Sequence, residues 1–227
     1  MAKQSGVTTK AQAVETAMRF TGLNRLQGTT VTAQRETVAE NKTPYLSNRI
    51  VNRQLWRVEI QNAVLKLKSG AAEVRDPYVR SFEVLIAEDT GELLGVDSSS
   101  GADVSDLRPR ASAKVAENQL REQGEIYAGF PPGEPRITFL DALDLILAKG
   151  VGSPYLAREI HASYVLHSDR GAKAHPVWVI TMRGLPPRQA HGPGGDAVPV
   201  WQRDHMRNVV DAESGVVLFA TNTPHPQ

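Results

Sequence analysis

The histidines are the side chains in this sequence best suited to chemistry, and all six lie in its second half. His161 and His167 fall on one face of a strand, because side chains alternate with a period of two and six residues separate them. With His175 close by, these imidazoles could bind zinc or a similar ion. Their spacing matches no short metal-ligand motif, however, and histidines are also common on solvated sheet faces. The sequence therefore predicts no metal and no cofactor, with His161, His167 and His175 as the weak candidates for a metal site.

No other group of residues indicates catalysis. Asp141 and Asp144 are adjacent on a helix surface, where we interpret them as the solvent-facing side of an amphipathic helix. The chain has no cysteine and no Gly-x-Ser-x-Gly sequence, and the glycine-rich stretch 192–195 lacks the Lys-Ser/Thr of a phosphate-binding loop. We therefore predict that the protein is not an enzyme. The alternative is a metal-dependent enzyme or metal-binding protein that uses the histidine-rich half.

The charges nearly cancel, with 26 Lys and Arg against 25 Asp and Glu, so no overall field attracts nucleic acid. Several cations nevertheless gather in the first half: Arg35, Lys42, Arg49, Arg53 and Arg57. They lack the interleaved aromatic residues of a nucleic-acid surface. We interpret them as a solvated strand face or the rim of a protein contact, and predict no nucleic-acid partner.

Two segments have the signals of capped helices. Thr9 and Gln12 form a capping-box pattern before an apolar stripe that ends at Gly22. Thr138 is placed as the N-cap of a second, more apolar helix that closes at 149–150. Each helix should lie against a sheet.

The segments that follow these helices also resemble each other. Trp56 and Trp178 lie in alternating, strand-like runs, and each half closes with an acidic-Thr/Ser-Gly turn between apolar runs, at Gly91 and Gly215. The spacing from tryptophan to glycine is 35 residues (91 − 56) in the first half and 37 (215 − 178) in the second. The sequence therefore predicts an α+β fold made of two repeats, each a helix packed on an antiparallel sheet.

The predicted organisation is a first module over residues 1–105 and a second over 138–227. Residues 106–137 between them are predicted to be a helical segment followed by a Pro/Gly-rich linker.

This combination of elements resembles the PepSY family, the peptidase-propeptide or YpeB-type domain, which has a cystatin-like fold. The resemblance is carried by the capped helix, the tryptophan strand and the hairpin sequence Val-Asp-Ala-Glu-Ser-Gly-Val-Val-Leu at 210–218, with a related hairpin at 86–94. The family occurs in propeptides of thermolysin-like metalloproteases and in secreted or membrane-tethered bacterial proteins. No His-Glu-x-x-His protease motif is present here, so the resemblance implies a tandem module that acts on a separate protein.

We therefore predict a non-catalytic protein-binding or peptide-binding module, similar to a protease inhibitor or an envelope-associated bacterial protein. Its recognition surface is predicted in the Pro/Gly-rich loop 184–200 and the adjoining strand edge, because an open antiparallel edge can accept an extended peptide. The binding candidates there are Arg188, His191, Trp201 and Arg203.

The predicted partner is a protein or peptide, with a protease as one example, and no membrane span is expected. The oligomeric state and the identity of the partner are left open by the sequence. The family resemblance suggests a place outside the cytoplasm, although the first residues lack the apolar run of a signal peptide.

Overall fold

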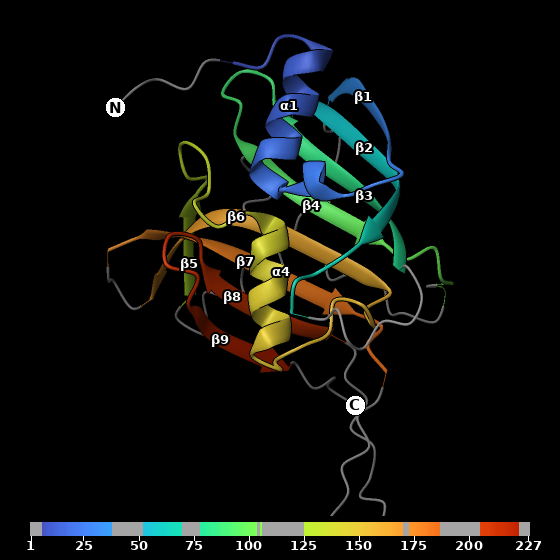
Figure 1. The fold of residues 1–227 in the computed structure, drawn as a ribbon. Coiled ribbons are helices and arrows are strands. Elements are labelled where there is room, and N and C mark those ends of the chain that lie inside the picture. Colours follow the sequence, from blue (N-terminus) through green and yellow to red (C-terminus); the bar gives the residue numbers. More distant parts are fainter. Residues whose placement is uncertain are drawn as a thin grey trace, which may run out of the picture.

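The computed structural model describes residues 6–37, 52–69, 78–103, 105, 125–169, 173–186 and 205–222. Within these ranges the chain forms a single antiparallel sheet of nine strands, with two short helices against one face (Figure 1). The strand order is β1-β2-β3-β4-β6-β7-β8-β9, and β5 pairs with β6 outside this path. The elements are α1 (Lys10–Thr21), a 3-10 turn (Leu23–Arg25), β1 (Thr30–Thr37), β2 (Gln54–Leu65), β3 (Tyr78–Ala87), β4 (Leu93–Ser99), β5 (Glu125–Gly129), α4 (Phe139–Ala148), β6 (Glu159–Asp169), β7 (His175–Arg183), β8 (His205–Asp211) and β9 (Val217–Asn222).

The predicted α+β class, with two repeats that each carry their own sheet, is wrong. The protein is predominantly β, and strands from both halves join in one continuous sheet through the pairing of β4 with β6. The period-2 pattern of a strand is the same whether its neighbour lies close or far in sequence. Pattern alone therefore could not show that the two predicted sheets are one.

Both helices begin and end as their terminal residues dictate. The Thr9 side chain accepts the main-chain N–H of Gln12 and the Gln12 side chain accepts the N–H of Thr9, and Gly22 takes a left-handed conformation at the other end of α1. Thr138 accepts the N–H of Asp141 at the start of α4. The caps satisfy main-chain groups that a helix terminus would otherwise leave unpaired.

The main core lies between the two helices and the sheet face that they cover. Along β2, Trp56, Val58 and Ile60 point into this core while Arg57 and Glu59 point away. The same alternation continues through β6 and β7, where Tyr164 and Trp178 stack with their ring centroids 5.3 Å apart. The opposite sheet face carries smaller apolar clusters, one of them formed by Val165, Val177, Val179 and Val209.

The two halves are joined by more than the strand pair. Arg80 of β3 is buried, and its guanidinium donates to Oγ of Ser98 at 2.8 Å and to the carbonyl oxygens of Ala157 at 2.8 Å and Pro154 at 3.2 Å. The phenol of Tyr155 accepts the main-chain N–H of Leu67 at 2.8 Å. These bonds tie the segment before β6 to the strands of the first half.

Helix α4 also packs against the first half. Phe139 contacts Phe82 edge to face, with ring centroids 6.3 Å apart. Asp144 is buried and lies 3.3 Å from the main-chain nitrogen of Ser69, and Lys68 pairs with Asp141. The prediction that Asp141 and Asp144 face solvent is therefore wrong for Asp144, because the loop after β2 covers that side of the helix.

The hydrogen bonds around the two tryptophans recur in both halves. The Trp56 indole donates to the carbonyl of Val7 at 2.8 Å, and the Trp178 indole donates to that of Ile137 at 2.7 Å, just before α1 and α4 respectively. Gly91 and Gly215 close equivalent hairpin turns, with φ of 68° and 76°. The left-handed conformation explains why glycine occupies both positions.

The region between the halves contains a strand that the sequence did not predict. β5 pairs with the second part of β6, so that Tyr127 lies opposite His167. The helical segment predicted within residues 106–137 is not seen in the described part of that range, and residues 106–124 lie outside the described residues.

Candidate functional site

The predicted recognition loop lies almost entirely outside the described residues. Arg188, His191, Trp201 and Arg203 all belong to this part, so their predicted role in binding stays a prediction. The described residues show where the loop leaves and re-enters the fold, after Gly184 at the end of β7 and before His205 at the start of β8. The open strand next to that end of the sheet is β9, whose Asn222 pairs with Met206.

The three candidate metal ligands occupy two separate places on the sheet. His161 lies opposite Thr181, whereas His167 lies six residues further along β6, opposite His175. No cluster of three or more His, Cys, Asp or Glu residues that could hold a metal ion occurs in the described ranges. The face shared by His161 and His167 therefore does not bring the histidines together, because the strand separates them along its length.

His161 instead belongs to a polar group where the two halves meet. Its Nδ1 lies 2.9 Å from Oδ1 of Asp97 on β4, and its Nε2 lies 3.4 Å from Oγ of Ser163. The order of contacts is that of a Ser-His-Asp catalytic triad. Sequence reasoning missed it because Asp97 comes from the other half of the chain, 64 residues away.

The surroundings of this group favour a structural role. The side chain of His161 is 3% exposed and Ser163 is 1% exposed, so the hydroxyl does not lie at the surface of the structure. The 3.4 Å contact to Ser163 is also long for a hydrogen bond that must transfer a proton. Asp97, whose side chain is 26% exposed, instead supplies a hydrogen-bond partner for the buried imidazole of His161 across the β4–β6 junction.

His167 and His175 form part of an aromatic cluster on the same sheet face. The ring of His167 lies 5.9 Å from that of His175, 5.4 Å from Tyr127 and 6.0 Å from Phe219, measured between centroids. Nε2 of His175 is 3.8 Å from a carboxylate oxygen of Asp211. These contacts pack the end of β6 against β5 and β9.

The turn carboxylates are held in their charged form by hydrogen bonds. Partial burial of Asp211 raises its pKa, but the main-chain amides of Ser214 and Glu213 donate to it at 2.7 and 3.0 Å and bring the pKa below the usual value. Burial also acts to raise the pKa of Asp89, but the hydrogen bond and the charge of Arg53 outweigh it, so that this pKa too lies below its usual value. Both residues stabilise turns and need no role in binding.

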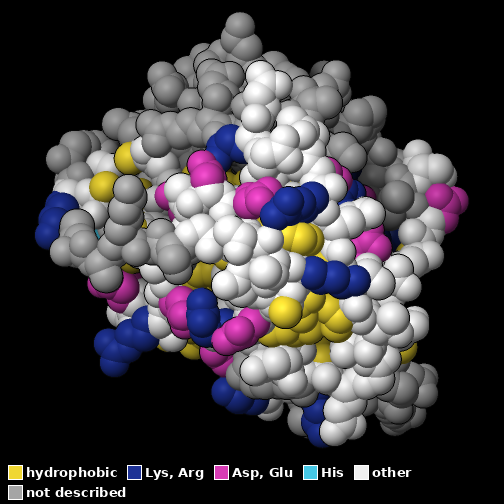
Figure 2. Space-filling model, turned by 90° about the horizontal axis from the view of Figure 1, so that it is seen from above, with side chains coloured by type: hydrophobic (Ala, Val, Ile, Leu, Met, Phe, Trp, Pro, Cys, Tyr) yellow, Lys and Arg dark blue, Asp and Glu magenta, His cyan; other side chains and the backbone are white. Residues whose placement is uncertain are grey.

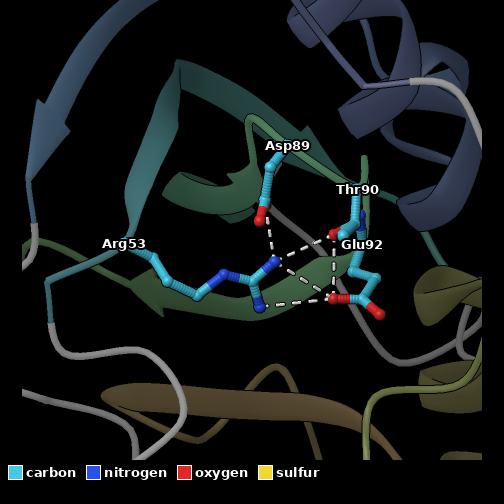
Figure 3. Close-up of polar contacts among 4 residues, drawn as sticks. All are labelled: Arg53, Asp89, Thr90 and Glu92. Carbon is cyan, nitrogen blue, oxygen red and sulfur yellow. Dashed lines mark hydrogen bonds and ion pairs between the residues drawn. The ribbon is translucent and has the colours of Figure 1, made fainter.

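Three of the cations singled out in the first half, Arg35, Arg53 and Arg57, pair with carboxylates of the same chain. Arg53 donates to Asp89 at 2.6 Å, to Oγ1 of Thr90 at 3.0 Å and to Glu92 at 3.3 Å, and so clamps the β3–β4 turn (Figure 3). Arg57 pairs with Glu36 and Glu83, and Arg35 with Glu88.

Each of these three arginines is paired with a carboxylate, and the Arg35 side chain is 51% exposed. The interpretation of these cations as a solvated strand face or the rim of a protein contact therefore stays a prediction. Lys42 and Arg49 lie outside the described residues. Viewed from above (Figure 2), the coloured part of the surface shows basic side chains interspersed with acidic ones around a small hydrophobic area. This distribution gives no continuous basic patch on the described part of that face.

The strand at the β9 end of the sheet is the feature that could bind a partner. Within the described residues β9 pairs only with β8, and none of these residues forms a strand on its outer side. Val216 and Leu218 expose 55% and 40% of their surface there. An open edge with exposed apolar side chains is a template for strand addition.

Comparison with family models, with characterised proteins and with solved structures finds no match to this chain. The resemblance to the PepSY family therefore stays a prediction. Neither helix of the described residues has the length and hydropathy needed to cross a membrane.

Proposed function

We propose that this protein is a non-catalytic module that binds an extended polypeptide along the outer edge of β9, next to the loop 184–200. The observation that carries the proposal is the outer edge of β9, which has no partner strand among the described residues and has Val216 and Leu218 exposed beside it. A strand added there would gain main-chain hydrogen bonds and cover both apolar side chains.

The chain itself contains an example of this kind of contact. β4 closes the sheet of the first half as β9 closes that of the second, and β4 accepts β6 along Val96–Ser99. An added strand at β9 would meet the same type of edge. The PepSY resemblance adds proteases and envelope proteins as the expected class of partner.

A displayed library of random peptides tests the proposal with the full chain. Selected peptides should protect the main-chain amides of β9 from hydrogen exchange, and L218D should abolish their binding because it places a charge in the contact. V79D is the matched control, since Val79 is 47% exposed but lies on β3, an interior strand of the sheet that is far from β9 in the strand order. Peptides that bind L218D as well as the wild type, or that protect amides elsewhere, would contradict the proposal.

The loop is tested separately by replacing residues 186–197 with a short Gly-Ser segment. If the loop contributes specificity, the selected peptides should bind this variant more weakly while its melting temperature stays close to that of the wild type. Unchanged affinity would remove the loop from the site and leave the β9 edge alone.

A further inference from the structure

The described sheet ends in two edge strands, β1 and β9. In hairpin register they correspond to β6 and β4, which pair with each other inside the chain. Among the described residues, β1 has only β2 beside it and β9 has only β8. The internal pairing of β4 with β6 shows how two strands of these types join.

β9 pairs with β8 in the same register as β4 pairs with β3. In one hairpin Val84 lies opposite Val96, with a register shift at Leu85–Ile86. In the other, Asn208 lies opposite Ala220, with the corresponding shift at Val209–Val210. At corresponding residues, β4 and β9 therefore point the same main-chain N–H and C=O groups outward.

β1 corresponds to β6 in the same manner. Trp56 of β2 lies opposite Arg35, and Trp178 of β7 lies opposite Tyr164. Arg35 of β1 therefore corresponds to Tyr164 of β6. It follows that the outer edge of β1 presents its main-chain groups as β6 presents them to β4.

We propose that the outer edge of β9 pairs with the outer edge of β1 of a second copy of this chain, in the register that joins β4 to β6. This inference rests on the proposed function, because it names the strand that the β9 edge accepts. Asp97 lies opposite His161 and Val96 opposite Ala162 in the internal contact. The same register places Thr221 opposite Thr32, and Ala220 opposite Ala33, of the second copy.

The residues at these edges permit such a contact. Neither Thr30–Ala33 nor Ala220–Asn222 contains a proline or a charged residue, the devices by which natural edges avoid pairing. Two threonines opposite each other are a favourable cross-strand pair. The net charge of +1 opposes association little.

The contact should nevertheless be weak. At the internal junction Phe139 of α4 packs on Phe82, but the corresponding place at the start of α1 is Lys10, so main-chain pairing would act without that aromatic packing. Because the contact joins two different edges, it is heterologous and adds copies head to tail. Association should therefore be reversible and increase with concentration.

Disulfide trapping tests both the contact and its register, because the chain has no cysteine of its own. The variants T32C and T221C are prepared separately as full chains and mixed in a glutathione redox buffer. Residues directly opposite in an antiparallel pair lie at a distance that a disulfide can bridge. We expect a mixed dimer, at a yield roughly tenfold above that of T30C mixed with T221C, which is two residues out of register.

The outcomes separate this inference from the proposed function. Equal yields from T32C and T30C, no mixed dimer, or a dominant T32C–T32C dimer would overturn the pairing of β9 with β1. If peptides still bind the β9 edge in that case, the proposed function stands and only the second copy is excluded. Failure of both peptide binding and trapping would remove both.

Discussion

The β4–β6 junction and the β9 edge show how the same kind of strand becomes interior or exterior. β4 and β9 close hairpins of matching register, but β4 is covered by a partner strand while β9 has none among the described residues. Around the junction the chain places a buried arginine, an Asp-His pair and a packed phenylalanine. Around the edge it places exposed Val216 and Leu218. The difference lies in the side chains that complete the contact, and the backbone alone does not decide it.

The largest difference in unfolding free energy is expected between a substitution in the main core and one at the β9 edge. W178A should lower the free energy of unfolding by about 3–5 kcal/mol, because Trp178 is fully buried against Phe139 and Tyr164. L218A should change it by no more than about 0.5 kcal/mol, as expected for an exposed side chain. Denaturant unfolding of both variants measures the contrast, and equal losses would refute the assignment of Trp178 to the core.

Arg80 is expected to have the next largest effect. R80A removes the donor to two carbonyls of the segment before β6 and to Ser98, and leaves these buried acceptors unpaired. We expect a loss of about 2–4 kcal/mol, since bonds to charged groups are strong and unpaired buried groups are costly.

R35A is the control, because Arg35 pairs with Glu88 at a half-exposed position and should cost at most about 1 kcal/mol. If R80A unfolds at the same denaturant concentration as R35A, Arg80 does not hold the two halves together.

Much of the local structure could be predicted from the sequence, and the joining of the two halves could not. The capping box at Thr9 and the alternation around Trp56 depend on neighbouring residues, and both occur as expected. Arg80 and Asp144 have residue types that are rarely buried, so only their distant partners explain their burial. Asp97 and His161 meet across the junction and carry no local signal. His161 and His167 do not meet for a related reason, because a shared strand face does not imply proximity.

Asp97 of β4 and Thr221 of β9 occupy corresponding positions in their hairpins. We expect a smaller difference in unfolding free energy between alanine variants at these two positions. D97A should cost about 1–3 kcal/mol because it leaves the buried Nδ1 of His161 without its partner. T221A should be nearly neutral, since the hydroxyl of Thr221 is buried and already has no hydrogen-bond partner within the described residues.

Thermal melts of both variants provide the test. A T221A loss as large as that of D97A would mean that the Thr221 side chain contributes to the edge in a way that the described contacts do not show.

The smallest contrast concerns the two hairpin turns and depends on pH. Asp89 and Asp211 both have pKa values below their usual 3.8, so each contributes stability that is fully present above that value and is lost as the pH falls through the lower, folded-state pKa. The side chain of Asp211 is 19% exposed and that of Asp89 is 66% exposed, so solvent screens Asp89 more. D211N should therefore flatten the acid side of the stability–pH curve more than D89N does. Close to pH 7 the curves of both variants should run parallel to the wild-type curve. Urea midpoints measured from pH 2 to 7 would show the opposite order if the solvent-exposed turn beside Arg53 were the more tightly coupled one.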